Sequence, residues 1–224
     1  MSTNESGGLL SLATLLAFLS GFVDTAAFIH MHGLFVAHVT GNFVLLGATL
    51  AGGGSLGAEA PEALQLAALP IFFLGAMLTG AIAPRLSAAR SLPAVLWSAV
   101  LLMLGVAGAS AWAGAGPWDA ASAVVLILAM GMLNAAHRLN PAMGPPFALM
   151  TGNVAQLAIR AAQLLHFAPP PAETAASGPE GKMLRAVLGF AAGCAAGAAA
   201  QVWLGLAAVG IPALLLAIGL ARRG

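Results

Sequence analysis

Long apolar stretches, separated by breaks rich in proline, glycine and charge, make up most of this 224-residue chain. A helix that crosses a bilayer needs about 20 mostly apolar residues. Five stretches have about that length: Leu9–Ile29, Ala63–Ala83, Leu92–Ala113, Ala120–Ala136 and Ala186–Leu204. A sixth, Ala207–Leu220, is apolar but short. The pattern predicts an all-α polytopic membrane protein with about six spanning helices.

Two further apolar stretches are interrupted by the same polar triplet, Thr-Gly-Asn. They are "GLFVAHVTGNFVLLG", Gly33 to Gly47, and "FALMTGNVAQLA", Phe147 to Ala158. Threonine and asparagine favour helix N-termini, so a short helix is expected to begin at each triplet after extended chain. Non-helical backbone at membrane depth is tolerated only inside protein or along a cavity. The triplets therefore predict two re-entrant or broken helical segments.

The distribution of basic residues indicates whether these segments cross the membrane, because lysine and arginine collect on the cytoplasmic side. If neither segment crosses, both termini are cytoplasmic and all eight basic residues lie on one side. If both cross, the basic residues are divided between the two sides. We therefore expect six crossings in a bacterial inner membrane. The basic residues are Arg85, Arg90, Arg138, Arg160, Lys182, Arg185, Arg222 and Arg223.

The chain also repeats itself. Gly21–Ala26 aligns with Gly131–Ala136, which pairs Asp24 with Asn134, and the two Thr-Gly-Asn triplets then coincide after a one-residue gap. Downstream, "FFLGAMLTGA" from Phe72 loosely resembles "GFAAGCAAGA" from Gly189. We expect a single integral membrane domain over residues 1–224, with one repeat at about 8–114 and another at about 118–222. Three crossings is an odd number, so the repeats are predicted to be inverted, as in many transporters.

The stretches "GFVDTAAFIHMHGLFVAHVTGN" and "GMLNAAHRLN…FALMTGN" resemble the YoaK-type family of bacterial membrane proteins, which is labelled as of unknown function. The resemblance covers most of the chain and implies a multi-span inner-membrane protein. Similar proteins often carry extra polar residues just before the second Met-Thr-Gly. Ala148 and Leu149 occupy those positions here, so the second site is more apolar than the resemblance implies.

Polar residues inside apolar segments are the candidate solute path. Two inverted short helices would bring two helix N-termini together, which suits an anion, a carboxylate or a neutral polar solute. Asparagine and threonine there either line the path or only cap the helices. The candidate path residues are Asp24, His38, Thr40, Gly41, Asn42, Asn134, Thr151, Gly152 and Asn153.

Asp24 is the only acid well inside a predicted span, and an ionisable group there indicates function by default. Three readings are open: a proton-coupling carboxylate, the partner of an internal cation such as Arg138, or an acceptor for broken backbone. Arg138 serves either as that partner or as a surface anchor. His38 is the best histidine for lining the site, whereas His30, His32 and His137 are expected near the interface.

Composition limits the remaining classes. Only 7% of residues are charged and the formal net charge is +1, so the lipid bilayer is an expected partner and nucleic acid is not. No metal motif, phosphate loop or Ser/His pair indicates an enzyme or a cofactor. Small residues spaced by four, Gly189, Gly193 and Gly197, indicate close helix packing within the chain or in a homodimer. The leading hypothesis is a transporter or channel for a small solute or ion; the alternative is a non-transporting membrane scaffold or partner subunit.

Overall fold

The computed structural model describes residues 11–51, 62–116, 118–139, 150–165 and 180–222. These residues form helices and connecting turns, with no strand among them. The α-helices are α1 (Leu12–His30), α2 (Gly41–Leu50), α3 (Glu62–Ile82), α4 (Ala88–Ala113), α5 (Asp119–Leu139), α6 (Met150–Leu164), α7 (Glu180–Leu204) and α8 (Gly210–Ala221). There are also two short 3-10 helices. η1 (Ala83–Arg85) extends α3, and η3 (Gly205–Val209) joins α7 to α8.

Five segments are long and apolar enough to cross a membrane, which confirms the expected all-α polytopic class. They are Leu12–His30, Glu62–Arg85, Ala88–Ala113, Asp119–Leu139 and Glu180–Ala221. Two of the helices begin at least a full turn earlier than hydropathy predicts, at Ala88 rather than Leu92 and at Glu180 rather than Ala186. The added turns contain Arg90, Lys182 and Arg185. These charged residues lower the hydropathy, but the backbone hydrogen bonds of the helix continue through them.

The fifth segment, Glu180–Ala221, is 42 residues long and contains a reversal of the chain. Gly205, with φ of +55°, follows α7, and a Cβ there would lie 4.0 Å from the His30 ring at the end of α1. A Cβ at Gly219 would lie 3.2 Å from Leu15 near the start of α1. Thus α8 runs back along α1, and it is the short sixth stretch expected from the sequence.

The most extensive packing joins the two halves of the chain. α1 packs against α7 and α3 packs against α5, while α4 contacts α5, α8 and η3. Glycines allow the α1–α7 contact: a Cβ at Gly193 would overlap the carbonyl of Phe18, and one at Gly197 would overlap that of Phe22. The small-residue stripe of α7 is therefore used within the chain, where it lets two backbones touch.

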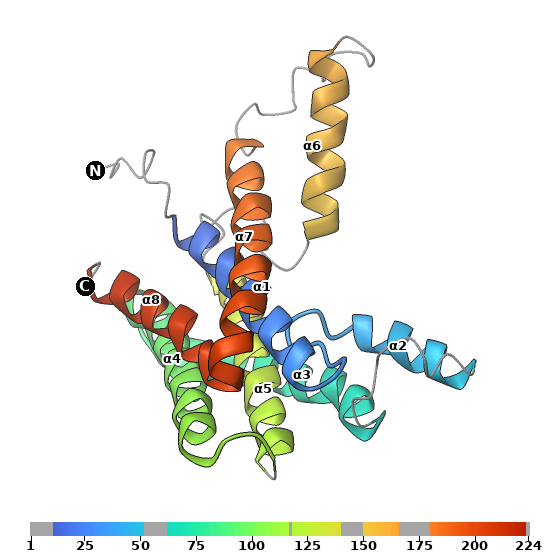
Figure 1. Cartoon of the computed structure of the whole chain (residues 1–224). Coiled ribbons are helices and arrows are strands. Elements are labelled where there is room, and N and C mark those ends of the chain that lie inside the picture. The colour runs from blue at the N-terminus through green and yellow to red at the C-terminus, as the bar shows by residue number, and fades with distance from the viewer. Residues whose placement is uncertain (1–10, 52–61, 117, 140–149, 166–179, 223–224) are drawn as a thin grey trace.

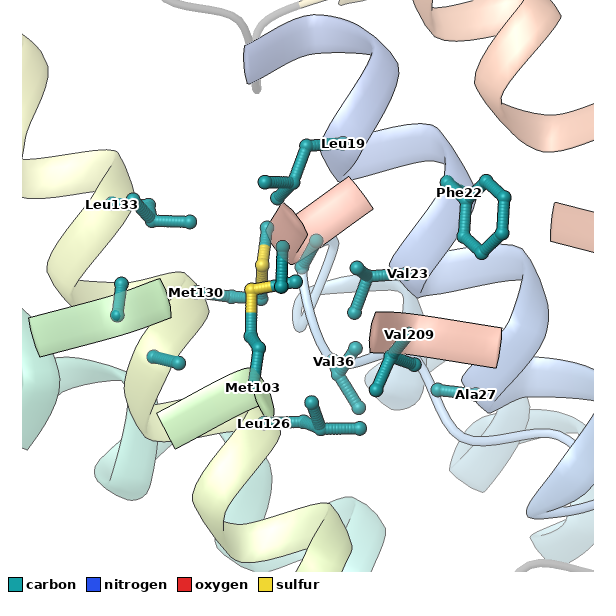
Figure 2. Close-up of a cluster of buried hydrophobic side chains, with 14 of the residues drawn as sticks. Leu19, Phe22, Val23, Ala27, Val36, Met103, Leu126, Met130, Leu133 and Val209 are labelled. Atoms are coloured by element: carbon teal, nitrogen blue, oxygen red, sulfur yellow. The ribbon is translucent and has the colours of Figure 1, made fainter. Parts of the chain in front are cut away.

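The core lies where α1, α4, α5 and η3 meet. Figure 2 shows Leu19 and Val23 of α1, Met103 of α4, Leu126 of α5 and Val209 of η3 in one cluster, and all are fully buried. Val36, from the non-helical chain after α1, lies in the same cluster and is also fully buried. Non-helical backbone thus enters the protein interior, where all its polar groups need partners.

The two short helices lie at the periphery of this bundle. In Figure 1, α2 projects to the right of the bundle and α6 stands beside the upper part of α7. α2 contacts α3, and α6 contacts α7. With 10 and 15 residues, these helices are about 15 and 22 Å long, which is less than the hydrocarbon layer.

Candidate functional site

The segment from Met31 to Thr40 connects α1 to α2 without helical structure. It leaves α1 through two residues with positive φ, His32 at 52° and Gly33 at 110°. Leu34 and Val36 are then fully buried. Buried non-helical chain lacks the regular bonds of a helix, so each buried N–H and C=O needs another partner.

Asp24 of α1 supplies several of those partners. It is 4% exposed, and its Oδ1 accepts hydrogen bonds from the backbone N–H groups of Val36 and Ala37, both at 2.8 Å. Its Oδ2 lies 2.8 Å from Nδ1 of His38. These contacts agree with the reading in which Asp24 accepts hydrogen bonds from non-helical backbone. Charge-assisted bonds of this kind offset the cost of burying a carboxylate.

Two amide side chains hold the first part of the same segment. Asn42 is fully buried; its Oδ1 accepts from the N–H of Phe35 and its Nδ2 donates to the carbonyl of Phe35, each at 2.9 Å. Nε2 of Gln65, from α3, donates to the carbonyl of Gly33 at 3.1 Å. Asn42 therefore fastens the turn that precedes α2, rather than capping the helix as the sequence suggested.

The N-terminus of α2 is closed by its own backbone. The N–H groups of Gly41, Asn42 and Phe43 bond to the carbonyls of His38, Val39 and Thr40. Thr40 is exposed and makes no capping bond with its side chain. These N–H groups are the donors that an anion at this helix end would need, so the geometry gives no support to an anion site at α2.

A hollow of about 210 Å³ lies beside the Asp24–His38 pair. Its walls come from α1, the Met31–Thr40 segment and α7, and they are formed by Asp24, Thr25, His38, Cys194 and three phenylalanines, Phe28, Phe35 and Phe190. The His38 ring meets the Phe190 ring edge-on, with centroids 5.2 Å apart. We call this space the Asp24 hollow.

The second set of predicted residues is arranged differently. Asn153 of α6 is 5% exposed, and its Nδ2 has no hydrogen-bond partner among the described residues; the same holds for Nδ2 of Asn134 in α5. Thr151 and Gly152 are exposed in the first turn of α6. Arg138 is exposed near the end of α5, while Asp24 pairs with His38. The extended chain predicted before this triplet lies outside the described residues.

Thus the structure brings Asp24 and His38 together at one hollow, with Asn42 fastening the same segment. Neither Asn42 nor Asn153 lines that hollow. α2 and α6 each contact a different long helix.

One family model matches residues 12–221 and carries the description "Protein of unknown function (DUF1275)". The chain belongs to this family. The match includes both triplets, Asp24, His38 and the α7 wall of the hollow. No curated protein and no solved structure matches the chain. DUF1275 membership thus names no activity, and function has to be argued from the site.

The structure of this DUF1275 protein also contains a polar cluster that the sequence analysis did not identify. His30 Nε2 lies 3.2 Å from Oδ1 of Asp119, and Nε2 of Gln201 lies 3.1 Å from His30 Nδ1. The cluster ties the end of α1 to α5 and α7. Gln65 and Gln201 stand in apolar stretches of α3 and α7, and that contrast is the sequence signal that would have indicated them.

Proposed function

We propose that this protein moves a small solute across the membrane, and that the Asp24 hollow lies on the solute path. The observation that carries the proposal is the pairing of an acid inside a candidate membrane span, Asp24, with the imidazole of His38, beside a space large enough for a small solute. Ionisable groups at this depth are costly and usually functional. Histidine exchanges its proton near neutral pH, so His38 provides a means of coupling solute movement to protons.

Matched helix contacts support the inverted repeat that this function uses. A Cβ at Gly21 of α1 would overlap the carbonyl of Phe190 in α7, and a Cβ at Gly131 of α5 would overlap the carbonyl of Phe72 in α3. Gly21 and Gly131 are the pair aligned by sequence. The contact between α1 and α7 therefore has a counterpart between α5 and α3.

Two further pairs keep the same register. A Cβ at Gly193 would overlap the Phe18 carbonyl, as one at Gly75 would overlap the Leu128 carbonyl. A Cβ at Gly197 would overlap the Phe22 carbonyl. At the equivalent position in the other helix pair, the hydroxyl of Thr79 donates to the Met132 carbonyl at 3.3 Å. These contacts pair Phe72 with Phe190 and Gly75 with Gly193. This register differs by one residue from the loose sequence match, which paired Phe73 with Phe190.

The ends of the helices support opposite orientations for the two halves. The end of α1 meets the start of α5 through His30 and Asp119, so the first helices of the two repeats run in opposite directions. α3 runs parallel to α5, because Gly75 and Thr79 meet Leu128 and Met132 in ascending order. Arg85 and Arg138 then lie at one end of the bundle, opposite Asp119. We assign that end to the cytoplasm of a bacterial inner membrane, with both chain termini.

Uptake into proteoliposomes tests the proposal. Full-length protein is reconstituted, and a panel of small cations, anions and neutral solutes is offered with and without a pH gradient. We expect at least one solute to enter faster than in protein-free vesicles. Asp24→Asn should abolish that uptake, whereas Phe73→Leu, on an exposed ring of α3 outside the hollow, should leave it unchanged. If every solute enters at the protein-free rate, the proposal is wrong.

A scaffold or partner subunit is the second candidate. It is favoured by the number of polar atoms that serve only to hold backbone: Oδ1 of Asp24, both amide atoms of Asn42 and Nε2 of Gln65. Under this alternative, Asp24 only holds the Met31–Thr40 segment and there is no solute flux to lose. The same proteoliposome panel therefore separates the two candidates.

A further inference from the structure

We propose that the Asp24 hollow takes a small organic ammonium ion, and that this ion competes with the proton on His38. This inference rests on the proposed transport function, since it names the class of solute that the same hollow accepts. It differs from the anion or neutral solute expected from the triplets, because the N–H groups at the start of α2 are already bonded.

The charge of the wall favours a cation. Asp24 is the only acid among the residues that line the hollow, and no lysine or arginine in the described part of the chain joins it there. The Asp24 carboxylate pairs only with His38 in that part of the chain. When His38 is neutral, the hydrogen bonds from Val36, Ala37 and His38 still satisfy the carboxylate oxygens, but the site carries a net negative charge that these bonds do not neutralise. A bound cation removes that imbalance.

The rest of the wall favours an organic cation with an apolar surface over a metal ion. Phe28, Phe35 and Phe190 surround the same space, together with the thiol of Cys194. Aromatic rings attract cations through the negative charge of their faces, and quaternary ammonium groups are recognised in this way. Among the described residues, no three histidine, cysteine, aspartate or glutamate side chains are placed to hold a metal ion.

The hydrogen bonds of Asp24 further limit the ligand. Its two oxygens already accept from Val36, Ala37 and His38, and a carboxylate has about four acceptor positions. A ligand that needs several hydrogen bonds from this carboxylate would have to break the bonds that hold the Met31–Thr40 segment. An alkylated ammonium ion needs only the electric field of the carboxylate and contact with the rings.

The Asp24–His38 pair also explains why the cation and a proton on His38 compete. The titratable groups facing the hollow are Asp24 from α1, His38 from the connecting segment and Cys194 from α7. When His38 carries a second proton, the Asp24–His38 pair is neutral and the hollow loses its attraction for a cation. When the cation binds to protein whose His38 is protonated, one proton leaves His38 for water, and return of that proton expels the cation.

Isothermal titration calorimetry on the purified full-length protein tests this inference, with choline as the probe. The neutral carbon analogue 3,3-dimethyl-1-butanol and the anion benzoate are the matched ligands. We expect choline to bind, and neither matched ligand to bind. Binding heats in buffers of different ionisation enthalpy should reveal the proton that the cation displaces.

Variants assign the binding to the hollow. Asp24→Asn should abolish choline binding while keeping the fold, since an asparagine oxygen still accepts from Val36 and Ala37. Phe190→Leu should weaken binding about tenfold, whereas Phe73→Leu, on a 63% exposed ring of α3, should leave it unchanged. His38→Gln should bind choline with the same affinity from pH 5 to 8.

Several results would overturn the inference: equal binding of the neutral analogue, binding of benzoate instead of choline, or choline binding unaffected by Asp24→Asn. The transport proposal fails separately. If choline binds as described and no solute enters proteoliposomes, the ligand class stands and transport is wrong. If proteoliposomes carry other solutes while choline does not bind, transport stands and the ligand class is wrong.

Discussion

The amide side chain of Asn42 bonds to both backbone groups of Phe35, its oxygen to the N–H and its nitrogen to the carbonyl, at 2.9 Å each. It thereby does for Phe35 what a neighbouring strand would do in a sheet. The glycine before it is needed for the same contact, because a Cβ at Gly41 would lie 2.8 Å from the Phe35 ring. In the first Thr-Gly-Asn triplet, glycine and asparagine thus fasten the non-helical chain around Phe35 to the start of α2.

The second triplet is expected to contribute less to stability. Asn153 stands seven residues after Pro146, as Asn42 stands after Phe35, and proline has no N–H to donate. Asn42→Leu should lower the free energy of unfolding by about 2 to 4 kcal/mol, because it leaves the N–H and the carbonyl of Phe35, both partly buried, without these partners. Asn153→Leu should lower it by less. Thermal unfolding of both variants in the same detergent measures the difference, and equal losses would contradict this account of the triplet.

Replacement of Asp24 by leucine should damage the fold, and replacement by asparagine should damage only function. Leucine leaves the N–H groups of Val36 and Ala37 buried without an acceptor, at about 1 to 3 kcal/mol each. Asparagine keeps an acceptor oxygen, and Asn134 already occupies the matching position in α5. Melting temperatures should fall much more for Asp24→Leu than for Asp24→Asn. Similar melting temperatures would mean that Asp24 does not hold the segment.

Helix contact through glycine gives a prediction with an internal control. Gly75 of α3 lies against the backbone of Leu128, whereas a Cβ at Gly80, on the same helix, would meet open space. Gly75→Ala should therefore cost about 1 to 3 kcal/mol through overpacking, and Gly80→Ala should change stability by less than about 0.5 kcal/mol. Thermal unfolding of the pair decides; tolerance of both would contradict the close α3–α5 contact.

The proposed topology predicts which side of the membrane each end of the bundle faces. In a Cys194→Ala background, a cysteine at Arg222 should react with a membrane-impermeant maleimide only from the cytoplasmic side. A cysteine at Trp118, which is 56% exposed, should react only from the opposite side. Labelling of both positions from one side would contradict the arrangement with six crossings.

The long helices could be predicted from the sequence because each has an apolar stretch of bilayer length. Hydropathy located them but missed the charged first turn of α7, since lysine and arginine lower hydropathy without ending a helix. The short α8 was predicted as a separate stretch. Its path back along α1 depends on the positive φ at Gly205, and the sequence does not reveal that conformation.

The sequence was enough to predict some residues of the site, but not how they are arranged in space. Asp24 and His38 stood out because charge is rare in this chain, yet their contact depends on how the Met31–Thr40 segment folds back over α1. Phe190 and Cys194 reach the hollow only through the packing of α7 on α1. Those residues look like ordinary packing residues in the sequence, so no local pattern could join them to residues far away along the chain.

The most direct test of the central claim uses Cys194, the only cysteine in the chain and part of the wall of the Asp24 hollow. The measurement is the rate at which the purified full-length protein in sealed vesicles reacts with a charged, membrane-impermeant methanethiosulfonate, with Cys194→Ala as the unreactive control. If the hollow lies on a solute path, Cys194 reacts from water, and the transported solute slows the reaction in the native protein but not in Asp24→Asn. If Cys194 reacts only with lipid-soluble reagents and no solute protects it, the hollow is not on a solute path and the central claim is wrong.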